Sequence, residues 1–257
     1  MIRVAIALPS LLLGLPIEGV ENPYLAAPIG RVRVSAEISE CGSPSIAVSG
    51  ADAALGDLVG RFWAKLVDGL NMRLCAKASL EPSAESPPPH SLYAATTAAL
   101  VYSVGRHHGE VLDEFEIVEL SRLSDPWELP WWQRALDAAR MSAATGSVVV
   151  YRNDEESAEL RKEELEVRFV RRSEVAPSRD FLSQSSMDAL VHMVGQTVVD
   201  ASEAIREKGG VAEEVLRRAR VQNAASHIIY GVPTPEEGCV WVPGTPLSLE
   251  LVCVRGR

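Results

Sequence analysis

The stretch PPPHSLYAATTAALVYSV, residues 87–104, decides the fold expected of this chain. A proline-rich lead ends at Pro89, small residues and two threonines follow, and an apolar helical run begins at Ala98. A helix N-terminus behind a tight loop offers free backbone N–H groups and the positive end of the helix dipole, and both favour phosphate. The stretch therefore predicts a phosphate-binding loop that opens a helix.

The glycines that such a loop needs are missing. Glycine lets the backbone close on an anion, but Tyr93 and Ala95 stand where glycines are expected. Forcing a residue with a Cβ into left-handed backbone geometry costs roughly 1–2 kcal/mol, so we expect the loop to relax into another shape. The same stretch thus favours a nucleotide-binding fold and weakens the expectation of nucleotide binding.

Composition and charge narrow the class of protein. Of the 257 residues, 47% are apolar and 23% are charged, as in a globular protein with a sizeable core. The net charge of −10 argues against a nucleic-acid groove or an anionic membrane surface as the main partner. The apolar run at the N-terminus is interrupted by Pro9 and is shorter than the ~20 residues that span a bilayer. A cytoplasmic protein is therefore expected.

The four cysteines are widely spaced and form no metal-ligand pattern, so a zinc site is not expected. Cysteine is among the most buried residue types. We therefore expect buried free thiols at the positions Cys41, Cys75, Cys239 and Cys253.

Hydrophobic periodicity predicts strands near both ends of the chain and helices between them. That order indicates an α+β chain with two sheet-containing halves. Residues 153–164 are polar and are expected to form an exposed loop or helix. Strands are expected over 2–8, 11–15, 31–38, 45–48, 72–78, 147–152, 165–170, 240–243 and 247–255, and helices over 53–70, 98–104, 110–121, 133–144, 180–208 and 211–224.

Three segments together resemble a known superfamily. They are NPYLAAPIGRVRVSAEI at 22–38, PHSLYAATTAAL at 89–100 and DAARMSAATGSVVVY at 137–151. The second aligns without a gap with the pattern P-x-x-x-G-L-G-S-S-A-A-L, in which Tyr93 and Ala95 replace the glycines and two threonines replace the serines. The segment YGVPTPEEGCVWV at 230–242 resembles a final glycine-rich turn before a strand. Their order is similar to that of the GHMP superfamily (galactokinase, homoserine kinase, mevalonate kinase and phosphomevalonate kinase), with mevalonate kinase the most similar member.

The resemblance implies a two-lobed α+β fold. The N-terminal lobe, residues 1–146, would resemble the second domain of ribosomal protein S5 and carry the degenerate phosphate loop. The C-terminal lobe, residues 147–257, would be a ferredoxin-like α/β unit.

The resemblance also implies an ATP-dependent kinase that phosphorylates a small hydroxylated metabolite, with a mevalonate-like acid as the first choice of acceptor. Asp137 would orient the acceptor hydroxyl, Thr97 would lie next to magnesium, and Arg31, Arg134 or Arg140 would pair with the γ-phosphate. The nucleotide would lie between two segments, on Tyr93, Ala94, Ala95, Thr96, Thr97, Gly231 and Gly238.

The departures from the family pattern leave a second interpretation open. The glycines of the phosphate loop are lost, the final glycine-rich turn is reduced to Gly231 and Gly238, and the first-strand motif lacks its acid unless Glu18 replaces it. The chain would then be a catalytically inactive relative that serves as a binding or subunit-interaction module. Thr96 and Thr97 would cap a helix in the ordinary way, and Asp137 would form an ion pair on a helix surface. Homo-oligomers, for example through an unpaired sheet edge, fit either interpretation.

Overall fold

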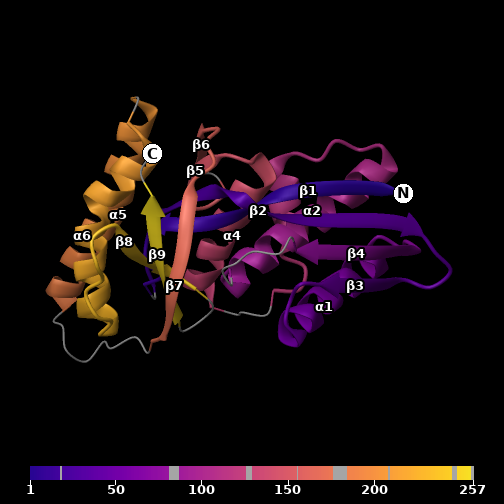
Figure 1. The fold of residues 1–257 in the computed structure, drawn as a ribbon, viewed down its shortest axis with the longest axis horizontal. Helices are drawn as coiled ribbons and strands as arrows, with labels where there is room; N and C mark the ends of the chain where they lie inside the picture. The colour runs from indigo at the N-terminus through magenta and orange to yellow at the C-terminus, as the bar shows by residue number, and fades with distance from the viewer. Residues whose placement is uncertain are drawn as a thin grey trace.

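The computed structural model of the 257-residue chain describes residues 1–17, 19–80, 87–125, 129–154, 156–175, 184–207, 209–244 and 248–255. These ranges form two sheets with helices packed around them (Figure 1), which confirms the predicted α+β class. The elements in chain order are β1 (Ile2–Leu13), β2 (Tyr24–Glu40), β3 (Ser45–Ser49), α1 (Ala53–Gly69), β4 (Leu74–Leu80), α2 (Pro89–His108), α3 (Glu114–Ser121), α4 (Pro130–Thr145), β5 (Val148–Tyr151), β6 (Ser157–Arg161), β7 (Glu166–Glu174), α5 (Gln184–Arg206), α6 (Val211–Tyr230), β8 (Cys239–Pro243) and β9 (Ser248–Arg255).

The larger sheet is built on the long strand β2. Its order is β3-β4-β2-β5-β6, and β1 also pairs with β2 in antiparallel register. The first residues of β2 pair with β5 and its last seven with β4, so this one strand joins two parts of the sheet. The strand expected over 31–38 lies within β2. Val34, Ala36 and Ile38 are buried on one face as expected, but Ser35 on the opposite face is buried as well, so that face is only partly exposed.

The smaller sheet has the order β7-β9-β8 and is antiparallel throughout. Helices α5 and α6 lie beside it at the left of Figure 1. The expectation of a loop or helix over 153–164 was wrong for β6, which forms an antiparallel pair with β5. Its last four residues alternate between half-buried and exposed, as at an edge strand, and the high charge of the segment concealed that alternation.

Helix α2 lies at the centre of the N-terminal half and packs on β1, β2, α1, α3 and α4. Its alanines at 94, 95, 98 and 99 have no accessible surface, and such small side chains let neighbouring elements approach closely. Helix α4 packs against both α2 and β2. Among the described residues, no helix combines the length and hydropathy required to cross a membrane.

The expectation of free thiols was wrong, because all four cysteines are paired. Cys41 directly follows β2 and is bonded to Cys75 in the neighbouring strand β4. Cys239 in β8 is bonded to Cys253, which is its direct partner in β9. Adjacent strands bring the pairs together over sequence separations of 34 and 14 residues, which the spacing of the cysteines alone does not reveal.

Candidate functional site

The segment expected to form a phosphate loop is part of helix α2. The helix begins at Pro89 behind the N-cap Pro88 and runs without interruption to His108. Proline suits the first helical position because the N–H that it lacks would have no partner there. The Leu92 N–H already donates to the Pro88 carbonyl at 3.1 Å. Residues 93–97 therefore lie in the interior of the helix, and the expected loop conformation is not observed.

The side chains of this segment are used for packing and for bonds within the helix. The hydroxyl of Thr96 donates to the Leu92 carbonyl at 2.7 Å, and that of Thr97 donates to the Tyr93 carbonyl at 2.9 Å. The Tyr93 hydroxyl donates to the Ser124 carbonyl at 3.0 Å. Ala94 and Ala95 are fully buried. Backbone N–H groups within an α-helix donate to carbonyls four residues earlier, so this segment presents no ring of free donors.

Asp137, the residue expected to orient an acceptor hydroxyl, is on α4 and only 3% exposed. Its Oδ2 accepts a hydrogen bond from Arg122 Nε at 3.1 Å. Its Oδ1 accepts from Gln133 Nε2 at 3.2 Å and from Arg140 Nη1 at 3.1 Å. The pair with Arg140 is the i,i+3 ion pair considered from the sequence, but it is buried instead of lying on the surface.

Asp137 belongs to a larger ionic cluster, defined here as Arg122, Asp125, Asp137, Arg140 and Asp154. Arg140 has no exposed surface and also pairs with Asp125. Burial disfavours the charge of Arg140, but the hydrogen bond and charge of Asp125, together with the charge of Asp137 and the Tyr93 hydroxyl, outweigh burial and raise the pKa of Arg140. Arg122 holds Asp154 through two hydrogen bonds, at 3.0 and 2.7 Å, which lower the pKa of Asp154. Two arginines thus neutralise most of the charge of three aspartates.

Arg140 joins two parts of the expected site. Its guanidinium carbon lies 5.7 Å from the centre of the Tyr93 ring, so Asp137 and the start of the 93–97 segment meet at this cluster. Another expected phosphate partner, Arg134, donates instead to the Val20 carbonyl at 3.0 Å and pairs with Glu21. Glu18 and the side chain of Arg31 lie outside the described residues.

Gly231 and Gly238 lie in a different part of the molecule. Gly231 caps α6 with a φ of 68°, and Gly238 has a φ of 89° just before β8. Their neighbours Val232 and Cys239 pack in an apolar cluster with Leu15 and Trp241. In Figure 1, α6 lies at the left end, whereas α2 lies right of centre. The two glycines serve as turns at the boundaries of these elements.

A second group of polar residues at the start of α2 was not predicted. His90 is buried in the first helical turn, and burial together with the charge of Arg172 on β7 lowers its pKa to about 3. Arg172 Nε lies 3.9 Å from Glu250 Oε1 on β9, and burial raises the pKa of Glu250 to about 7. His90 is in α2, Arg172 in β7 and Glu250 in β9, so these side chains are far apart in the sequence. Only the position of His90, next to the proline-rich lead, could have pointed to this group from the sequence.

Several solved structures resemble this chain over nearly its full length. Phosphomevalonate kinase from Streptococcus pneumoniae, in complex with phosphomevalonate and AMPPNP, matches 100% of this chain and 93% of its own with a TM-score of 0.61 at 14% identity. Mevalonate diphosphate decarboxylase from Enterococcus faecalis matches 98% and 88% with a TM-score of 0.60 at 11% identity. Mevalonate kinase from Staphylococcus aureus matches 98% and 89% with a TM-score of 0.55 at 15% identity.

The chain has the GHMP fold. The likeness extends over nearly its full length, as the order of the sequence segments indicated. No protein-family model and no curated protein sequence matches it. At identities of 11–15%, the likeness shows the fold alone. What the site can do must therefore be argued from the residues of this chain.

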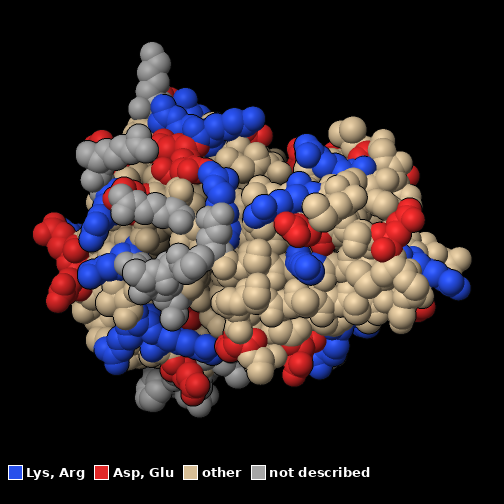
Figure 2. All heavy atoms as spheres, turned by 45° about the vertical axis from the view of Figure 1, so that its right-hand side comes forward, with Lys and Arg blue, Asp and Glu red and all other residues tan. Residues whose placement is uncertain are grey.

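A cavity of about 520 Å³ lies between the β1–β2 connection, β5 and α5, and no residue of the ionic cluster lines it. Its lining carries three acidic side chains, Glu21, Glu156 and Asp188, but only one arginine, Arg152. Carboxylates repel a phosphorylated ligand unless cations neutralise them. Within the described ranges, no group of three or more His, Cys, Asp or Glu side chains is placed to hold a metal ion. On the face in Figure 2, side chains of both signs are interspersed between broad uncharged areas.

Proposed function

We propose that this chain is a catalytically inactive GHMP-fold protein that serves as a binding or subunit-interaction module. One observation carries the proposal: α2 continues without interruption from Pro89 through residues 93–97. A loop that cradles a triphosphate must aim several backbone N–H groups at the anion. In this chain the corresponding N–H groups are inside a helix, and the side chains around them are buried.

The surroundings of Asp137 support the same conclusion. A catalytic base or orienting group needs a carboxylate oxygen within reach of a substrate hydroxyl. Arg122, Gln133 and Arg140 already donate to the two oxygens of Asp137. ATP and magnesium are therefore a poor fit to the residues present.

A small-molecule kinase is the second candidate function. It is favoured by the contact between Arg140 and both Asp137 and Tyr93, which places two of the expected site residues together. In this alternative ATP and magnesium bind near residues 93–97 and a mevalonate-like acid is the acceptor. The first turns of α2 would have to unwind to free their N–H groups, and Tyr93 would lose its burial.

Calorimetric titration with ATP, with and without magnesium, separates the two functions. We expect no saturable heat at millimolar ATP and no change in melting temperature. Thr97→Ala and Asp137→Ala are titrated beside the wild type, and Thr145→Ala is the matched control because its hydroxyl donates to a helix carbonyl in the same way. Magnesium-dependent binding that Thr97→Ala weakens, and that Asp137→Ala and Thr145→Ala leave unchanged, would refute the inactive module.

A further inference from the structure

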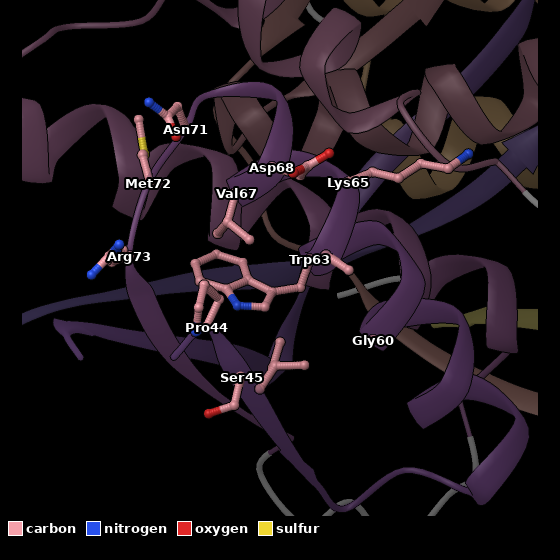
Figure 3. A pocket seen from close by; sticks show the side chains of 12 residues that line it. Pro44, Ser45, Gly60, Trp63, Lys65, Val67, Asp68, Asn71, Met72 and Arg73 are labelled. Carbon is pink, nitrogen blue, oxygen red and sulfur yellow. The ribbon is translucent and has the colours of Figure 1, made fainter. Parts of the chain in front are cut away.

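A hollow of about 630 Å³ lies between the C-terminal half of α1 and the sheet edge at β3 (Figure 3). We call this hollow the edge groove. Residues of α1 form one wall, and the start of β3 and the α1–β4 connection form the other. Gly60, Trp63 and Ala64 line it from the helix, and Ser45, Ile46 and Arg73 from the opposite side. The groove is formed by elements other than α4 and the ionic cluster.

Strand β3 is an edge with little protection against pairing. In the part of the chain that the structure describes, it pairs only with β4. Its five residues, SIAVS, carry no charge, and Ser45, Ala47 and Ser49 are exposed. Natural edge strands are usually blocked by charged side chains, proline or a bulge, because their outer N–H and C=O groups pair readily with another strand. Here Pro44 precedes the strand and does not interrupt it.

The α1 wall of the groove leaves room for a polypeptide backbone. Gly60 and Ala64 are one helical turn apart, and a Cβ added at Gly60 would meet no heavy atom within 4 Å. Trp63 of the same helix also lines the groove. Its side chain is only 1% exposed, and its Nε1–H has no hydrogen-bond partner. In Figure 3 the indole lies among the lining residues near Pro44 and Ser45. A buried donor without a partner destabilises the fold, and an acceptor brought to this position would remove that cost.

The charges around the groove indicate the sign of its ligand. The chain carries a net charge of −10, but the lining has two cationic side chains, Lys65 and Arg73, and one anionic side chain, Asp68. Lys65 Nζ donates to the Leu123 carbonyl at 3.4 Å, while Arg73 is exposed in the α1–β4 connection, directly before β4. An acidic side chain on the ligand would meet Arg73.

From these contacts we infer that the edge groove binds an extended, acidic peptide segment of a partner protein. The segment adds as a strand to β3, its backbone passes over Gly60 and Ala64, and one of its carbonyls accepts the Trp63 Nε1–H. Peptide recognition at sheet edges works in this way, with backbone bonds giving affinity and pockets giving specificity. The inference rests on the proposed binding role and gives it a site and a class of partner.

The test uses the purified full-length chain and a phage-displayed library of random dodecapeptides. We expect selected peptides that carry acidic residues and that, once synthesised, protect the amides of residues 45–49 from hydrogen exchange. Gly60→Leu fills the groove without a backbone clash and should weaken their binding by about tenfold or more. Ala54→Leu adds the same side chain elsewhere on the exposed surface of α1 and should leave their affinity unchanged.

Several results would overturn the inference: no enrichment over an empty support, binding that Gly60→Leu leaves intact, or a dimer of the chain that this variant dissociates. Melting temperatures of both leucine variants establish that they fold. Trp63→Phe removes the N–H and should weaken the peptide in the same direction. Nucleotide titration of the same preparation keeps the two proposals apart, because magnesium-dependent ATP binding that Thr97→Ala weakens refutes the inactive module, while a failed peptide selection refutes only the groove.

Discussion

At the scale of single residues, Glu250 has the environment most sensitive to pH. It is only 6% exposed on β9, and burial raises the pKa of its carboxyl group to about 7, against the opposing influence of Arg172. Gly244 makes this packing feasible, because a Cβ there would lie 2.9 Å from Glu250 Cγ and Oε1. The side chain therefore changes charge near neutral pH while it remains inside the fold.

Glu250 is expected to make the free energy of unfolding fall as the pH rises from about 4.5 to 7. In that window the folded chain keeps a proton that the unfolded chain releases, so each pH unit favours unfolding. Glu250→Gln removes the effect, and its free energy of unfolding should gain on the wild type by about 2 to 3 kcal/mol between pH 5 and pH 8. Urea unfolding at the two values measures this. Glu237→Gln, an exposed control, should follow the wild type, and parallel profiles for both variants would contradict the assignment.

At the scale of elements, α2 shows what a local pattern reveals and what it conceals. The apolar run over 98–104 was enough to predict a helix, and α2 contains it. The N-terminal extension was not predicted, because it depends on the burial of Leu92 and Tyr93 against distant parts of the chain. The Tyr93 ring packs beside Arg140 of α4, and its hydroxyl reaches Ser124. Tertiary packing, which no short motif records, thus decided between loop and helix.

Only part of the ionic cluster could be predicted from the sequence, again because tertiary packing brings the rest of it together. Asp137 and Arg140 are three residues apart on one helix, and this spacing alone indicates contact. Asp125 and Asp154 come from segments on either side of α4, and Arg122 follows α3. Their approach depends on how α3, α4 and β5 pack. The sequence therefore indicated the central pair but gave no sign that the pair is buried.

The buried pair should show strong coupling in a double-mutant cycle. Arg140→Met leaves Asp125 and Asp137 buried without a guanidinium, whereas adding Asp137→Asn relieves part of that charge, so we expect a coupling of about 2 kcal/mol or more. The exposed pair Arg152–Glu156, at 2.7 Å, is the control, and its coupling should stay below about 0.5 kcal/mol. Urea unfolding of the wild type and the six variants gives both values. Additive effects at Asp137 and Arg140 would show that the pair contributes nothing specific.

At the scale of the whole molecule, one disulfide ties each sheet. Cys41–Cys75 links β4 to the end of β2 in the larger sheet, and Cys239–Cys253 links β8 to β9 in the smaller one. Each bridge spans strands that already pair through their backbones, so the fold does not need it to bring them together. The main effect of the bridges is therefore expected in the unfolded chain, whose freedom they restrict.

Removing either bridge should destabilise the oxidised protein, and the longer loop should matter more. The separations of 34 and 14 residues correspond to about 4 and about 3 kcal/mol of lost stability in the chain-entropy description. The measurement is urea unfolding of a Cys41→Ala, Cys75→Ala variant and a Cys239→Ala, Cys253→Ala variant, each with and without reductant. Reductant should lower the stability of the wild type toward that of the variants. If the oxidised wild type and the variants unfold at the same urea concentration, the cysteines do not form bridges in solution, and the free thiols expected from the sequence would be correct after all.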